Sequence, residues 1–157
     1  EEPEYYTKAL ASPDSLSVDL LRSLSVQLRF GTKQYIEEFE KLFGVQLLVE
    51  AIRWCDYKCS SLWHFHRKKE QKTKTIVTGG DKNSAFPGIT MNTVPSKLQS
   101  EEKFKHVVDI LCHVVRAIIA ILHHPVPSPL HSFVSTHDGI SISIRILEWC
   151  PLSLQGE

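Results

Sequence analysis

Two stretches of the sequence decide the fold that we expect: Gly44–Cys55 reads GVQLLVEAIRWC, and Gly139–Cys150 reads GISISIRILEWC. They align without a gap, and the same offset sets Leu24 against Ile119 upstream, so we expect those two residues to be buried at one repeat position. Two copies of a helical unit indicate stacked α-helical repeats of the armadillo or HEAT type. Such units stack because none buries its apolar face alone, and the stack presents an extended surface. The repeat therefore favours a binding scaffold over an enzyme built around a pocket.

The composition is that of a single globular domain. The chain has 157 residues, and 18 basic side chains balance 18 acidic ones, so net charge gives no argument for a nucleic-acid partner. The longest aliphatic run, Ala117–Leu122, is far shorter than the roughly 20 residues that cross a bilayer, and no signal-peptide pattern is present at the start. Four cysteines, at positions 55, 59, 112 and 150, are interpreted as buried thiols of a reducing compartment. We expect a cytoplasmic protein.

The first 60 residues predict three helices. Leucines at helical spacing from Leu16 to Leu28 predict the first helix, which Gly31 ends. Thr32 can cap the second helix, and Gly44 precedes the third, which is expected to end at about Cys55. Three helices of this length match one armadillo-like unit, so we assign residues 1–60 to the first unit.

Residues 61–100 interrupt this pattern. The apolar periodicity fails, and the segment contains Arg67-Lys68-Lys69, Gly79-Gly80 and Pro95. We expect a flexible, basic, irregular insertion, which is either a solvated loop or a weak contact for an anionic membrane. From the sequence of residues 101–157 we predict a second armadillo-like unit, which belongs to the same continuous domain. It has a long buried helix, a short helix and a final helix whose apolar face a longer chain or a dimer would cover.

Few residues suggest chemistry. Cys55, Cys59, His64 and His66 are zinc-type ligands close together in the sequence. However, Cys150, which matches Cys55 in the repeat, has no such neighbours, so we prefer a buried Cys55 and surface histidines and predict no metal site. No serine or cysteine lies in a nucleophile motif, and no phosphate-binding loop is present. We therefore expect a protein that is not an enzyme and needs no cofactor.

Several segments in order resemble the N-terminal regulatory region of diaphanous-related formins. They are Pro3–Tyr6, the LLRSLSVQL stretch at Leu20–Leu28, YIEEF at Tyr35–Phe39, and GVQLL at Gly44–Leu48. The later helices at Lys105–Ile121 and Gly139–Trp149 are similar to the next armadillo unit of that region. In place of the asparagine-rich loop and tryptophan that are common in the family, this chain has RFGTKQ and then Tyr35.

The resemblance implies a regulatory binding module. In that family the region binds a GTP-loaded Rho-type GTPase, which releases inhibition by the protein's own C-terminal autoregulatory helix. By position, the implied GTPase-facing residues are the end of the first helix and the loop after it: Val26, Leu28, Arg29, Phe30, Gly31, Thr32, Lys33 and Gln34. Phe30 is either an exposed hot-spot residue beside Arg29 or a residue packed under the next helix.

The resemblance thus leads us to expect an all-α, armadillo-like module that binds an active Rho-family GTPase and regulates actin assembly at the cytoskeleton. Two alternatives stay open. One is a generic armadillo-like adaptor that binds a helical peptide, and the other is a small metal-binding module.

Overall fold

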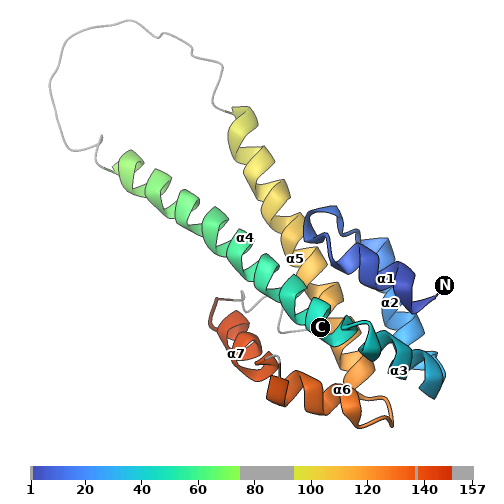
Figure 1. Cartoon of the computed structure of the whole chain (residues 1–157). Helices are drawn as coiled ribbons and strands as arrows, with labels where there is room; N and C mark the ends of the chain where they lie inside the picture. The colour runs from blue at the N-terminus through green and yellow to red at the C-terminus, as the bar shows by residue number, and fades with distance from the viewer. Residues whose placement is uncertain (1, 75–93, 137, 150–157) are drawn as a thin grey trace, which may run out of the picture.

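The computed structural model describes residues 2–74, 94–136 and 138–149, with side chains described for 2–61, 101–135 and 138–147. Within these ranges the chain is helical and contains no strand, which confirms the all-α prediction (Figure 1). No helix in the same ranges has the length and apolar content that crossing a membrane requires. The elements in chain order are α1 (Pro3–Leu10), the 3₁₀ turn η1 (Pro13–Ser15), α2 (Val18–Phe30), α3 (Lys33–Lys41), α4 (Gly44–Lys74), α5 (Val94–Leu122), α6 (Ser128–His131), the π-helical turn η2 (Ser132–Thr136) and α7 (Gly139–Trp149).

Local capping sets the beginnings and ends of the N-terminal helices. The Ser17 hydroxyl accepts a hydrogen bond of 3.2 Å from the Leu20 backbone N–H and caps α2. The Thr32 hydroxyl accepts one of 3.2 Å from the Tyr35 N–H and caps α3, as predicted. Only Gly31 and Thr32 separate α2 from α3, so this short connection fixes the C-terminal end of α2 and its last residue, Phe30.

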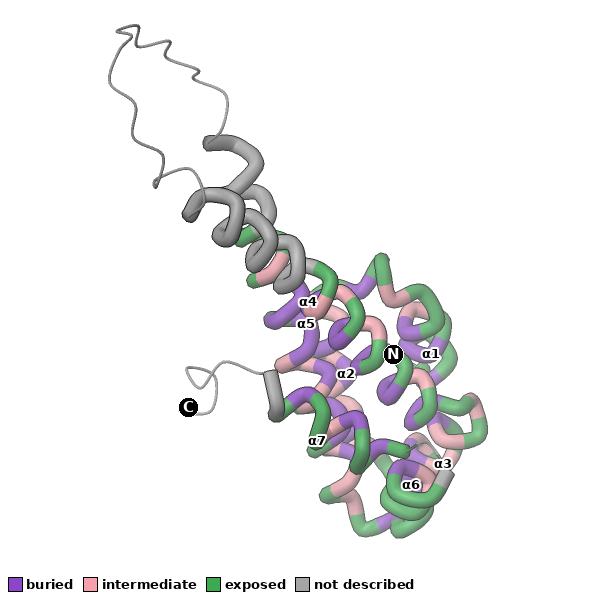
Figure 2. Tube along the Cα trace, turned by 90° about the vertical axis from the view of Figure 1, so that its left-hand side faces the viewer, coloured by how far each residue is buried: buried purple, intermediate pink, exposed green. Residues whose placement is uncertain are grey.

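The core lies where α5 packs against both α2 and α4, with α1, α3, η2 and α7 against α4 and α6 against α5. Figure 2 shows buried residues concentrated along these contacts. The largest fully buried side chains come from five helices: Tyr6, Leu10, Leu21, Leu24, Leu28, Ile36, Phe39, Leu48, Val49, Ile52, Ile110 and Ile121. Burying a side chain of this size contributes about 1.5–3 kcal/mol, so this cluster supplies the main stabilisation of the fold.

Part of the expected irregular insertion is helical. Helix α4 continues to Lys74 and α5 begins at Val94, so the prediction is wrong for 61–74 and 94–100. The Arg, Lys, Glu and Gln residues that dominate the end of α4 remove the apolar periodicity, yet they are good helix formers. The end of α4 and the start of α5 extend away from the other helices (Figure 1). The remainder of the predicted insertion, 75–93, lies outside the described residues.

The repeated motif has a structural counterpart at its first residue. Gly44 begins α4 and Gly139 begins α7, and each follows a residue with positive φ, 61° at Phe43 and 53° at Asp138. A Cβ on Gly44 would overlap the ring of Phe39, and a Cβ on Gly139 would overlap the ring of Phe133. Both helices therefore start by the same device, in which an aromatic ring packs against a glycine Cα.

Beyond their first residues, the two copies differ in burial. Val45, Val49 and Ile52 of α4 are buried, whereas their counterparts in α7, Ile140, Ile144 and Leu147, are exposed. The expectation that Leu24 and Ile119 are both buried is also wrong, because Leu24 is 0% exposed and Ile119 is 48% exposed. Helix α4 contacts neighbours on several sides and α7 on fewer, so the same apolar pattern is covered in one copy and open in the other.

Three polar contacts join the C-terminal third of the chain to the N-terminal half. Arg145 Nε lies 3.0 Å from Oδ2 of the buried Asp56 and ties α7 to α4. The Ser132 hydroxyl donates a 2.7 Å hydrogen bond to Glu40 Oε1. The Nε2 atom of His124 lies 3.2 Å from the Gly31 carbonyl oxygen, and because a carbonyl only accepts, the imidazole donates. This last bond anchors the α2–α3 connection to the end of α5.

A candidate partner-binding groove

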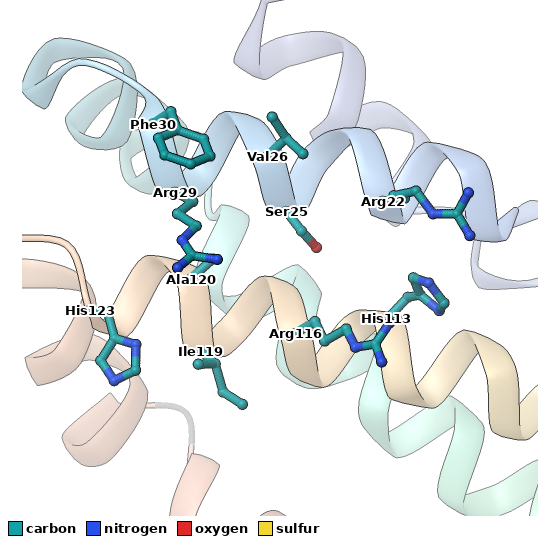
Figure 3. Close-up of a pocket in the computed structure, with 10 residues that line it drawn as sticks. All are labelled: Arg22, Ser25, Val26, Arg29, Phe30, His113, Arg116, Ile119, Ala120 and His123. Carbon is teal, nitrogen blue, oxygen red and sulfur yellow. The ribbon is translucent and has the colours of Figure 1, made fainter. Parts of the chain in front are cut away.

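A groove of about 530 Å³ runs between α2 and α5 (Figure 3). Its lining residues recur every three or four positions along each helix, so they occupy one face of each. They are Arg22, Ser25, Val26, Arg29 and Phe30 from α2, and His113, Arg116, Ile119, Ala120 and His123 from α5 and its C-terminal end. The opposite face of α2 carries the buried leucines of the core, which fixes the orientation of the groove face.

Large apolar side chains are open to solvent in this groove. Phe30 is 77% exposed, Val26 is 51% exposed and Ile119 is 48% exposed. If a partner covered these apolar side chains, the free energy of binding would gain about 25 cal/mol for each Å² of apolar surface that is removed from water. Several such side chains together, with polar groups around them, are typical of an interaction surface.

Every titratable side chain that lines the groove is basic. Arg22, Arg29 and Arg116 are the fixed cations, and two histidines accompany them. Arg22 lies 3.7 Å from Asp19, whose side chain is almost fully exposed, so this pair is weak. Among the described residues, no ion pair joins Arg29 or Arg116 to a carboxylate. The groove thus combines exposed apolar area with positive charge that is largely uncompensated.

Arg29 and Phe30 form a local pair within this surface. The guanidinium carbon of Arg29 lies 5.7 Å from the centroid of the Phe30 ring, which is a cation–π distance. Figure 3 shows the Arg29 side chain reaching from α2 over Ala120 of α5. The hydrogen bond from His124 to Gly31 holds the residue immediately after Phe30. The α2–α3 connection is therefore anchored to α5 directly beside the exposed ring.

The residues that the resemblance assigned to the partner surface divide into three groups. Val26, Arg29 and Phe30 lie together in the groove, and the alternative in which Phe30 packs under the next helix is wrong. Leu28 is 0% exposed, so its assignment as a contact residue is also wrong. Its position, four residues after Leu24, puts it on the core face of α2.

The remaining predicted residues follow the groove in the chain without lining it. Gly31 is partly buried and accepts the bond from His124. Thr32 is exposed and caps α3, and Lys33 is exposed and lies 3.6 Å from Glu37. Gln34 is exposed at the start of α3. These residues follow Phe30 directly in the chain, and Thr32, Lys33 and Gln34 are exposed.

The α5 side of the groove was missed by the sequence reasoning. Arg116, Ile119 and His123 lie about ninety positions away from Val26 in the chain, and they join it only because α2 packs against α5. The signal that was available is the basic or polar character of Arg116 and His123 on a helix that is otherwise strongly apolar. A sequence pattern alone does not show which other helix faces them.

A second cleft, of about 760 Å³, lies between η1, α4 and α5, but it is lined by carboxylate and lysine side chains in equal number, and two of them form an ion pair. Lys58 lies 3.2 Å from Asp14 and 5.4 Å from the centroid of the Trp54 ring. The cleft also contains both an acidic and a basic residue of α5, Glu102 and Lys103. This cleft lacks the uncompensated positive charge of the α2–α5 groove. The α2–α5 groove is therefore the stronger candidate site.

The cysteines do not favour the metal-binding alternative. Cys55 and Cys59 are buried in the core, and burial raises the pKa of the Cys55 thiol to about 12, with Cys59 and Cys112 adding to the effect. Among the residues that the structure describes, no three His, Cys, Asp or Glu side chains are grouped to hold a metal ion. The side chains of His64 and His66 lie outside the described residues.

Comparisons of the chain with models of protein families, with curated proteins and with solved structures found no match.

Proposed function

We propose that the chain is an armadillo-like regulatory module of a formin-type actin-assembly factor and that it binds a Rho-family GTPase in its GTP form. The observation that carries the proposal is the exposure of Val26, Arg29 and Phe30 on one face of α2. These are residues that the formin resemblance implies for GTPase contact, and their chemistry suits that partner. The module itself uses neither GTP nor magnesium, because the GTPase carries both.

The chemistry of the groove supports this partner class. The switch segments of a small GTPase become ordered when the γ-phosphate is bound, and they then present apolar residues beside acidic ones. Phe30 and Val26 supply apolar area that a partner can desolvate, and Arg29 supplies charge-assisted hydrogen bonds to a carboxylate. The anchoring of Gly31 by His124 reduces the ordering cost of binding, since the connection beside Phe30 is already held.

In this proposal the module has a second ligand, the C-terminal autoregulatory helix of the parent protein, which the GTPase displaces. The protein would then act in the cytoplasm, at sites of actin assembly. The two ligands are then coupled: a bound GTPase lowers the affinity of the module for the autoregulatory helix, and a bound helix lowers the affinity for the GTPase by the same factor.

The test is a pull-down against a panel of Rho-type GTPases, each loaded with a GTP analogue or with GDP. We expect retention of at least one GTPase in the GTP-analogue state only, and loss of that retention in Phe30→Ala. The matched control is Tyr57→Ala, which removes a similarly exposed aromatic ring from α4, outside the groove. Binding to no member of the panel, or equal binding in both nucleotide states, would refute the proposal.

One observation favours the alternative, an adaptor for a helical peptide. Ile140, Ile144 and Leu147 are exposed along one face of α7, at a spacing that a partner helix can match. An adaptor of this kind binds its peptide through α7 and does not distinguish nucleotide states of a GTPase. The Ile144→Asp variant separates the two functions, because it removes peptide binding at α7 and leaves the groove between α2 and α5 unchanged.

A further inference from the structure

The α2–α5 groove carries a second feature besides its exposed ring. Arg22 from α2 and Arg116 from α5 line the same stretch of the groove, and in Figure 3 the imidazole of His113 lies between them. The three side chains come from two helices that pack against each other, so the two guanidinium groups and the imidazole line one groove. This stretch lies away from Phe30 along α2.

The protein leaves this charge almost unneutralised. Among the residues that the structure describes, no acidic side chain lines the groove, Arg22 is paired only with the exposed carboxylate of Asp19 at 3.7 Å, and no carboxylate forms an ion pair with Arg116. Like charges held near one another repel, at an energy that grows as water is excluded between them. A bound anion with more than one negative group removes this repulsion and replaces it with attraction.

The geometry of the side chains narrows the class of anion. A guanidinium presents planar, paired N–H donors that match the oxygens of a phosphate group. Two arginines on facing helices match two neighbouring phosphates better than a single one. The groove volume, about 530 Å³, is within the range of about 300–1,000 Å³ that is typical of small-ligand sites.

We propose that the stretch of the groove around Arg22 and Arg116 binds adjacent phosphate groups of a compact organic polyphosphate, such as a phosphorylated inositol. The same chemistry is offered by a free inositol phosphate and by the headgroup of a phosphoinositide in a membrane. This site does not depend on the proposed GTPase binding, because it uses the arginines away from Phe30.

The experiment titrates the purified chain with inositol trisphosphate in a calorimeter, at about 0.1 M salt and at about 0.5 M salt. We expect saturable binding that weakens at the higher salt concentration. Arg22→Gln and Arg116→Gln should each weaken binding by about tenfold, the loss typical of a charge-assisted pair. Arg53→Gln is the matched control, because Arg53 is an exposed arginine of α4 that interacts with Glu50 at 3.2 Å, outside the groove. The control should bind like the unmodified protein.

A second arm identifies the source of the ligand. Sedimentation with phosphatidylcholine vesicles that contain phosphatidylinositol bisphosphate is compared with vesicles of equal charge made with phosphatidylserine. Preference for the bisphosphate vesicles, lost in Arg116→Gln, supports a lipid headgroup, whereas binding of the soluble trisphosphate alone supports a free ligand. Absence of binding in both arms, or equal loss in Arg53→Gln and Arg116→Gln, overturns the site.

Two readouts keep this result separate from the proposed function. Thermal melting should be unchanged in both groove variants, because Arg22 and Arg116 are exposed. Phe30→Ala should remove GTPase binding and retain trisphosphate binding. The GTPase proposal and the polyphosphate proposal can therefore fail independently of each other.

Discussion

The ring of Phe39 packs directly against the Cα of Gly44, so that any side chain at Gly44 would occupy the space of the ring. Phe39 is fully buried and cannot swing away without opening the core. The contact fixes the angle at which α4 leaves α3, and α4 in turn is packed against α5. A single local contact thus sets the direction of one of the two longest helices.

Gly44→Ala should therefore destabilise the protein by about 1–3 kcal/mol, the usual cost of inserting a methyl group into a packed core. Urea unfolding followed by circular dichroism measures the change. Gln46→Ala, at an exposed position of the same helix, should be nearly neutral. Adding Phe39→Leu to Gly44→Ala should recover part of the loss, and if the double variant is instead as unstable as the two single losses combined, the clash is not the cause.

Leu24 and Ile119 provide a contrast in burial at positions that the repeat pairs. Leu24→Ala should cost about 2–5 kcal/mol because it leaves a cavity in the core. Ile119→Ala should cost less than about 1 kcal/mol, since the side chain is 48% exposed in the groove. Unfolding free energies of the two variants check this, and equal losses would mean that Ile119 is as well packed as Leu24.

This pair also shows how far the sequence predicts the structure. The stop at Gly31, the cap at Thr32 and the start at Gly44 follow from local chemistry and were predicted correctly, whereas the predicted end of the third helix at about Cys55 is wrong, because α4 continues to Lys74. Burial depends on which elements pack against a helix, and the apolar pattern of α5 does not reveal that the face carrying Ile119 borders an open groove. The repeat therefore predicted the helices and the shared glycine starts, but not the equivalent burial.

The candidate site divides in the same way. The resemblance pointed to Val26, Arg29 and Phe30, which line part of the α2 side of the groove, but it did not point to Arg22 and Ser25 on the same side. The α5 side, including Arg116, required the packing of α2 on α5. The resemblance assigns Leu28 to the surface together with its neighbours in the sequence, but helical geometry turns Leu28 toward the core.

The buried thiol of Cys55 gives a prediction in alkaline solution. Burial raises its pKa from 9.0 to about 12, so the folded state holds the thiol proton at pH values where the unfolded chain has lost it. The contribution of this protonated thiol to the free energy of unfolding is therefore present in full below pH 9, and it is lost progressively as the pH rises from 9 toward 12. In Cys55→Ala the unfolding free energy should fall less steeply over this range than in the unmodified protein. Urea unfolding at several pH values between these limits gives both slopes, and parallel slopes would contradict the assignment to Cys55.

The partner surface gives the last prediction. Val26 and Arg29 line the groove and are exposed, so charge changes there should act on binding and not on folding. Val26→Asp places a carboxylate on the apolar part of the surface, and Arg29→Glu reverses the charge beside Phe30. Each variant should abolish binding to the GTP-loaded GTPase that the unmodified protein retains, while the circular dichroism spectrum and the melting temperature stay nearly unchanged. Leu28→Asp is the informative contrast, because Leu28 belongs to the core and its replacement should unfold the protein. If Val26→Asp and Arg29→Glu both bind with unmodified affinity, the GTPase contacts another face of the molecule and the α2–α5 groove is not its site.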